Sequence, residues 1–133
     1  MEKYIKDFDR WNKKKKELES RVIDESFFFL DKEIWWTATG VNIGSEMDGK
    51  NDNFERPVLI FKKINQNNFL SIPITSKYKE NSNIYVFRYK DKEYYLCIDQ
   101  LRYLNIKRLL RLITRIEDDE FKSIKDTIIN WLE

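Results

Sequence analysis

A chain of 133 residues with 41% hydrophobic and 36% charged residues suffices for one small globular domain and is too apolar to be disordered. A net charge of +2 excludes a generic polyanion binder, and the absence of histidine excludes Ser-His-Asp and Cys-His triads and histidine-built zinc sites. The single cysteine, Cys97, excludes an internal disulfide and is typical of a reducing compartment.

The beginning of the chain gives no sign of export or membrane insertion. Met1–Tyr4 is charged and lacks the apolar core of a signal peptide. The longest apolar run, Phe27–Leu30, is far too short to span a bilayer. We therefore expect a soluble cytoplasmic protein with no membrane partner.

The first predicted element is an amphipathic helix of about twenty residues, since apolar side chains recur at helical spacing. Those side chains are Tyr4, Phe8, Trp11, Leu18 and Val22. The lysine run Lys13–Lys16 lies on the polar side, and a solvated helix face explains it better than RNA contact. Exposing the stripe costs about 1.5–3 kcal/mol per large side chain, so we expect it to pack on its own barrel or on a second subunit.

Beyond Phe27 the pattern changes to short runs rich in β-branched and aromatic residues, which predicts strands. The expected strands cover residues 34–37, 57–63, 69–74, 84–89, 94–98 and 112–116. Lys90–Glu93 is a polar hairpin connection and Lys107–Leu110 one helical turn. Many short strands at close spacing indicate a strongly curved sheet or a partly open barrel.

A second helix is predicted at the end of the chain. Asp118 is its expected N-cap, with further acids in the first turn. One face carries Phe121, Ile124, Ile128 and Trp131. The longest break between elements, Gly40–Glu55, is a candidate functional loop.

Charge is unevenly distributed along the chain. Five basic and no acidic residues occur between Arg102 and Arg115, whereas acids outnumber bases ten to three from Glu17 to Glu55. A basic surface beside an acidic one is compatible with RNA binding, and ordinary solvated charge explains either cluster equally well.

Three sequence blocks carry a resemblance to a known family. They are Gly44-Ser45-Glu46 with Gly49 and Arg56-Pro57-Val58-Leu59-Ile60; Pro73-Ile74-Thr75-Ser76; and Asp99-Gln100-Leu101-Arg102 with Lys107-Arg108-Leu109. In this order and spacing they resemble the MazF/PemK family of toxin endoribonucleases. The resemblance runs from about Glu33 to the last helix.

The resemblance implies an α+β, mainly β fold: a small SH3-like barrel of the MazF/PemK type with a C-terminal helix. We expect one toxin-like domain over residues 1–133, with a helical extension over 1–30 and the barrel plus C-terminal helix over 31–133. The family also implies the toxin of a type II toxin–antitoxin pair, a homodimer inhibited by a cognate antitoxin protein. Its activity would be metal-independent, sequence-specific cleavage of single-stranded mRNA through 2′-hydroxyl attack, with no cofactor.

The resemblance also assigns site residues by position. The implied catalytic residues are Arg56, Thr75, Glu46 and Asp99, and the expected substrate-binding residues are Ser76, Lys50, Gln100 and Arg102. Arginine presents a planar fork that matches two phosphate oxygens, threonine donates through its hydroxyl, and a partly buried carboxylate can accept the 2′-hydroxyl proton. Whether Glu46 or Asp99 is the base stays open.

The chain departs from the family pattern at three points. The spacer between Gly49 and Arg56 is longer than usual, Met47 replaces a common glutamine, and Cys97 stands where PemK-type members carry a second arginine. Taken alone, Arg56 would be a surface salt bridge, for example with Glu55, and Cys97 a buried small apolar residue.

Two other functions remain open. A toxin of the same fold could act by protein binding, like the gyrase poisons, through a C-terminal helix such as the one that carries Trp131. An inactive barrel that only binds a partner is the third hypothesis.

Overall fold

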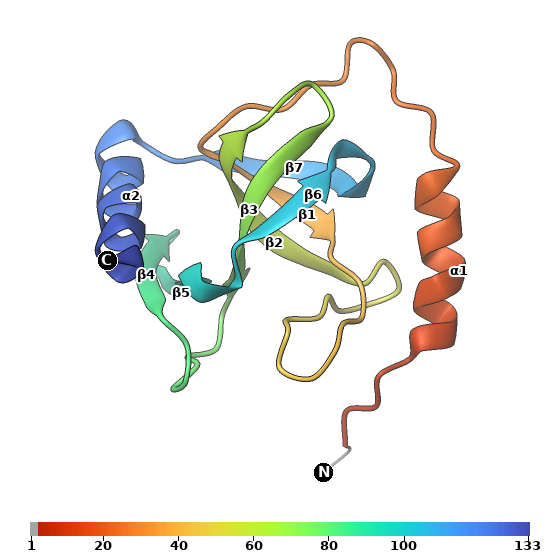
Figure 1. Ribbon diagram of the computed structural model, residues 1–133, viewed down its shortest axis with the longest axis horizontal. Helices are drawn as coiled ribbons and strands as arrows, with labels where there is room; N and C mark the ends of the chain where they lie inside the picture. The colour runs from red at the N-terminus through yellow and green to blue at the C-terminus, as the bar shows by residue number, and fades with distance from the viewer. Residues whose placement is uncertain (1–2) are drawn as a thin grey trace.

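Seven antiparallel strands form one sheet with a helix on either side of it in the computed structural model, which describes residues 3–133 (Figure 1). The helices are α1 (Phe8–Glu19) and α2 (Asp118–Leu132), and two short 3₁₀ turns are η1 (Ile98–Gln100) and η2 (Ile106–Arg108). The strands are β1 (Glu33–Ala38), β2 (Glu55–Lys63), β3 (Asn68–Thr75), β4 (Ile84–Tyr89), β5 (Lys92–Cys97), β6 (Arg102–Asn105) and β7 (Leu109–Arg115). The strand order is β4-β5-β3-β2-β1-β7, with β6 paired to β3.

The predicted mainly β fold with a helix at each end is confirmed. Two register shifts between β1 and β7, at Ile34/Trp35 and Trp36/Thr37, leave Ile113 and Leu110 of β7 as extra residues, and such bulges bend this end of the sheet. A third shift lies in β2 between Ile60 and Lys62. Because β3 pairs with β2 on one side and with both β5 and β6 on the other, the sheet curls into a barrel-like shape.

Six strands lie where the alternation predicts them, and β6 was missed. This strand has four residues, of which only Leu104 is buried, so it carries no alternating apolar pattern. It forms because its backbone pairs with β3, where Asn68 lies opposite Asn105 and Ser71 opposite Arg102.

The hairpin between β4 and β5 is tighter than expected. The turn consists of Lys90 and Asp91, with φ values of 50° and 62°, and β5 already begins at Lys92. Positive φ at both central residues is the geometry of a type I′ turn, which matches the twist of the flanking strands.

The prediction of a twenty-residue first helix is wrong in its length. Helix α1 has twelve residues, and Asp7 caps its start by accepting a hydrogen bond from the backbone N–H of Arg10 (3.0 Å). Val22 lies outside the helix and is 92% exposed. Only Trp11 and Leu18 of the predicted stripe are buried, so two anchors and not a continuous face hold the helix to the barrel.

The N-cap of helix α2 lies one residue before the predicted one. Its N-cap is Glu117, whose side chain makes no capping bond, whereas Asp118 belongs to the first turn, where a negative charge is favoured. Ile124 and Ile128 are buried as expected. No helix within residues 3–133 is long and apolar enough to cross a membrane.

Three apolar clusters form the interior. The largest joins α2 to the sheet through residues such as Leu59, Ile72 and Ile124. A second surrounds Phe29 and Phe69. The third seats α1, with Trp11 and Leu18 against Ala38, Val41 and Phe54. The third cluster matters for the site, because Val41 and Phe54 belong to the long loop between β1 and β2.

Candidate active site

Arg56 lies near the start of β2 and is held in place by backbone carbonyl groups. Its Nε donates to the carbonyl oxygen of Asp48 (2.8 Å), and its Nη1 donates to that of Ile74 (3.2 Å). The guanidinium is half-buried, and this burial lowers the pKa of Arg56. A guanidinium has five N–H donors, so a side chain fixed through two of them keeps donors for an anion.

Thr75 lies close to Arg56. Arg56 Nη1 donates to the carbonyl oxygen of Ile74, the residue before Thr75, and both Arg56 and Thr75 line the same hollow. Thr75 is buried, and its Oγ1 accepts a hydrogen bond from the backbone N–H of Lys77 (3.1 Å). The hydroxyl proton of Thr75 is then available for a second oxygen, such as one on a phosphate.

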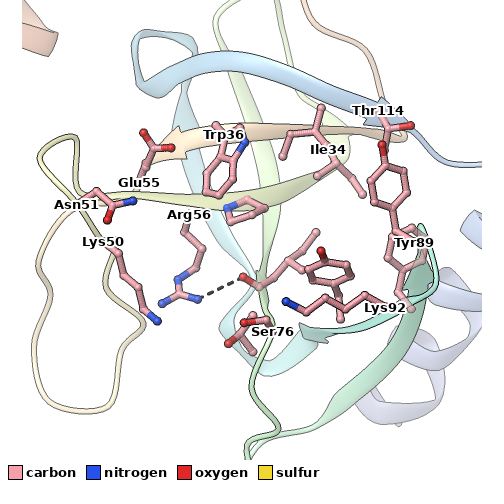
Figure 2. A pocket seen from close by; sticks show the side chains of 16 residues that line it. Ile34, Trp36, Lys50, Asn51, Glu55, Arg56, Ser76, Tyr89, Lys92 and Thr114 are labelled. Atoms are coloured by element: carbon pink, nitrogen blue, oxygen red, sulfur yellow. Dashed lines mark hydrogen bonds between the residues drawn. The ribbon is translucent and has the colours of Figure 1, made fainter.

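A hollow of about 350 Å³ lies in front of this pair. Figure 2 shows Lys50 and Arg56 together on one side of the hollow, Ser76 below them and Tyr89 on the far side. Further apolar and aromatic side chains line it: Ile34, Trp36, Pro57, Ile74, Phe87, Tyr94 and Ile113. The hollow therefore combines a cationic side with flat apolar surfaces, a combination that suits a nucleotide.

Lys50 belongs to a concentration of positive charge at this hollow. Two backbone hydrogen bonds with Glu55, each of 2.8 Å, fix its position in the loop. Burial lowers the pKa of Lys50, and the nearby charges of Arg56, Lys77 and Lys79 lower it further. These positive charges repel one another in the free protein, and a bound anion such as a phosphate would reduce that repulsion.

A second hollow of about 530 Å³ lies on the other side of Arg56, which lines both. The remaining predicted site residues line this second hollow: Glu46, Asp99, Gln100 and Arg102. The structure thus divides the predicted set into two groups, with Thr75, Ser76 and Lys50 in the first hollow, the two carboxylates in the second, and Arg56 between them.

The loop that carries Glu46 is pinned in spite of its extra length. Gln100 accepts a hydrogen bond from the backbone N–H of Met47 (2.9 Å) and donates to the carbonyl oxygen of Ser45 (3.0 Å). Glu46 is exposed, and its Oε1 accepts from the backbone N–H of Ile43 (2.9 Å). Asp99, in η1, is exposed as well. Gln100 therefore ties the loop to the turn that holds Asp99.

Most of the predicted basic surface between Arg102 and Arg115 is engaged inside the protein. Arg102 donates to the carbonyl oxygen of Thr39 (3.1 Å) and Arg108 to that of Ala38 (3.0 Å). Burial lowers the pKa of Arg102, and the charge of Glu46 partly opposes this. These arginines hold the end of β1, so the cluster is not a continuous free cationic face.

The alternative role of Arg56 as a partner of Glu55 is wrong. Glu55 is 5% exposed and forms a bidentate pair with Arg111 (2.7 and 3.3 Å), which itself lies over the ring of Trp36. Cys97 is fully buried, and burial raises the pKa of its thiol, in agreement with a small apolar role.

Several residues at the site lie outside the predicted set. Asp48 supplies the carbonyl group that fixes Arg56, and a backbone acceptor cannot be predicted from a pattern of side chains. Lys77 and Lys79 come just after the block that ends at Ser76, and their charge was the available signal. The aromatic wall with Trp36 and Tyr94 comes from two strands that only the topology brings together.

Comparison with family models shows a match over most of the chain. Residues 31–132 match the family model described as PemK-like, MazF-like toxin of type II toxin-antitoxin system. No curated protein matched the chain. Glu46, Lys50, Arg56, Thr75, Ser76, Asp99, Gln100 and Arg102 all lie inside the matched range, whereas α1 lies outside it.

Proposed function

The chain belongs to the PemK-like, MazF-like toxins of type II toxin–antitoxin systems, and from this premise we propose that it is a sequence-specific endoribonuclease that cleaves single-stranded mRNA without a metal ion. The observation that carries the proposal is the fixed guanidinium of Arg56 close to Thr75, beside a cationic and aromatic hollow. That arrangement offers a phosphate a planar donor fork and offers the adjoining bases flat surfaces.

The proposed reaction uses the 2′-hydroxyl of the RNA as nucleophile. A carboxylate, Glu46 or Asp99, accepts the 2′-hydroxyl proton from the side of the second hollow, and the 2′-oxygen attacks phosphorus. Arg56 and Thr75 donate to the phosphoryl oxygens as negative charge grows on them. The bond to the 5′-oxygen breaks, that oxygen takes up a proton, and a 2′,3′-cyclic phosphate and a 5′-hydroxyl result.

Substrate binding falls to residues around this centre. Lys50 and Ser76 would contact phosphates in the first hollow, and Gln100 and Arg102 would contact RNA in the second. Metal-independence is part of the proposal because Arg56 supplies the positive charge and a carboxylate accepts the proton, so the chemistry above requires no metal ion.

The proposal extends to partners and place of action. As the toxin of a pair, the chain would be inhibited by a cognate antitoxin protein. We propose that it works as a homodimer in the cytoplasm, as one toxin-like domain with an added N-terminal extension.

RNA cleavage in excess EDTA tests the proposal. The wild-type protein should cut single-stranded RNA and leave 2′,3′-cyclic phosphate ends, and Arg56→Ala should lose about a hundredfold or more. Arg115→Ala, which removes an exposed arginine, is the matched control and should keep full activity. Cleavage that requires added magnesium would refute the mechanism.

A toxin that acts by protein binding is the second candidate. The observation in its favour is the exposed end of α2, where Trp131 is 38% exposed beside Leu132 and Ile129. A protein of this kind, or an inactive barrel, would leave RNA intact in the same assay. Loss of toxicity on Trp131→Ala with unchanged RNA cleavage would favour the protein-binding function.

A further inference from the structure

The segment from Tyr4 to Trp11 lies outside the range matched by the toxin family, yet it contacts the loop between β1 and β2 at several points. This loop, residues 40–54, contains Glu46, Asp48 and Lys50. We call residues 4–11 the N-terminal clamp.

The first contacts of the clamp converge on one turn of the loop. Lys6 Nζ donates to the carbonyl oxygens of Asn42 (2.6 Å) and Gly44 (3.0 Å). The same ammonium lies 3.4 Å from the carboxylate of Asp48. Lys6 thus donates to two backbone carbonyl groups that precede Glu46 in the loop. Without Lys6, these carbonyl groups would need water as a hydrogen-bond donor.

Tyr4 reaches the same carboxylate. Its hydroxyl donates to Oδ2 of Asp48 (2.8 Å), while Oδ1 accepts from the backbone N–H of Asn42 (2.6 Å). Burial of the hydroxyl end and the bond to Asp48 raise the pKa of Tyr4 to about 12, so the group stays a donor at neutral pH. Both oxygens of Asp48 are therefore engaged.

The other end of the clamp is anchored by packing. Trp11 is buried against Phe54, with ring centroids 5.6 Å apart, and an added Cβ on Gly40 would lie 2.4 Å from its ring. Arg10 pairs with Asp52 (3.0 Å) and lies over the ring of Phe54. Both ends of the loop are thereby attached to the same short stretch of chain.

The contacts lead directly to the proposed catalytic arginine, since the residue bound by Tyr4 and Lys6 also gives its carbonyl group to Nε of Arg56. We propose that Tyr4 and Lys6 are positioning residues, which fix Asp48 and through it set the orientation of Arg56. This inference rests on the proposed ribonuclease function for its kinetic consequence. Its structural half, the immobilisation of the loop, does not depend on that function.

Kinetics of the double variant Tyr4→Phe/Lys6→Met test the inference. We expect kcat to fall about tenfold or more, with KM changed less than twofold, because a misplaced catalytic group costs rate rather than substrate binding. Lys6→Arg, which keeps a donor and a charge, should retain most of the activity. Lys15→Met removes an exposed lysine of α1 and should behave as wild type.

A double-mutant cycle with Arg56→Lys separates positioning from simple stabilisation. If the clamp acts through Arg56, adding Tyr4→Phe/Lys6→Met to Arg56→Lys should cause little further loss of kcat. An equal loss in both backgrounds, an unchanged kcat in the double variant, or the same loss in Lys15→Met would overturn the inference.

Amide hydrogen exchange provides a measurement that needs no activity. Residues 42–48 should exchange faster in the double variant than in wild type, while β3 and β5 keep their protection. If the wild-type protein cleaves no RNA, the proposed function fails, and exchange still decides the clamp: unchanged exchange at 42–48 would refute it.

Discussion

Arg56 is held by two carbonyl groups, from Asp48 and Ile74, and by no carboxylate of residues 3–133. A carboxylate partner would neutralise the guanidinium, whereas carbonyl groups orient it and leave its full charge for the phosphate. The same bonds make this side chain part of the loop-to-strand connection, so its replacement affects both rate and stability.

Arg56→Lys should separate charge from geometry. Lysine keeps the charge but loses the planar fork, so we expect cleavage to fall about a hundredfold. The free energy of unfolding should fall by about 1–3 kcal/mol, because the carbonyl groups of Asp48 and Ile74 lose a charged donor. Single-turnover cleavage and urea unfolding measure the two effects, with Arg115→Lys as the control. A folded Arg56→Lys protein of full activity would place the site elsewhere.

Lys50 should give RNA binding a dependence on alkaline pH. Its pKa is lowered, so its proton leaves at a lower pH than that of a free lysine, and affinity for RNA should fall as the pH rises through that range. The sign for stability is the reverse, since the unfolded chain binds this proton more tightly and stability rises with pH there.

Affinity for an oligonucleotide that lacks the 2′-hydroxyl, measured from neutral pH to about pH 10, tests this effect. Lys50→Arg should bind with an affinity that stays flat to higher pH on the same oligonucleotide, because arginine keeps its charge. An identical alkaline decline in both proteins would show that Lys50 does not contact the substrate.

At this scale the sequence blocks predicted that neighbouring strands bring Arg56 and Thr75 toward one phosphate, and the two residues line the same hollow. The same blocks did not predict that Arg56 separates two hollows. That division depends on the path of the loop through Asp48, and loop paths follow from backbone hydrogen bonds that side-chain patterns do not encode.

Among the elements, strands with a buried face were predictable, and β6 and the end of α1 were not. Alternation marks a strand only when one face is apolar, and β6 is defined by its pairing with β3. The spacing of Val22 with Leu18 predicted that the helix continues to Val22, but Ser20 ends α1. Arg21 turns toward η2 and donates to the carbonyl oxygens of Lys107 (2.8 Å) and Leu109 (2.6 Å).

The β4–β5 hairpin can be stabilised at its turn. Lys90 and Asp91 both adopt positive φ, which costs energy for these residues and suits asparagine and glycine. Lys90→Asn/Asp91→Gly should raise the free energy of unfolding by about 0.5–1 kcal/mol, as measured by urea unfolding. Activity should not change. A loss of stability would mean that the turn is not of type I′.

At the scale of the whole molecule, the structure consists of a family barrel and an extension that covers its loop side. Figure 1 shows α1 and α2 on opposite sides of the sheet, so the two helices stabilise different parts of the interior. The apolar stripe predicted that the first helix packs on its own barrel or on a second subunit, and it packs on the loop-bearing side of its own barrel.

Deleting the residues before Asp24 tests this packing. The deletion removes buried Trp11 and Leu18 and exposes Val41 and Phe54 to water, so we expect a loss of about 2–5 kcal/mol in the free energy of unfolding. Thermal and urea unfolding measure it, and sedimentation follows the oligomeric state. A truncated protein with an unchanged melting temperature would show that the extension does not stabilise its own barrel.

Gly40 has a consequence for the history of this chain. Its φ of +85° favours glycine or asparagine in any relative, but the 2.4 Å approach of the Trp11 ring forbids any Cβ while tryptophan is present. Positions 11 and 40 should therefore covary: homologues with an aromatic residue at 11 should keep glycine at 40, and asparagine should appear there in lineages that lost the helix. The Trp11 ring therefore turns a conformational preference for glycine at position 40 into a steric requirement.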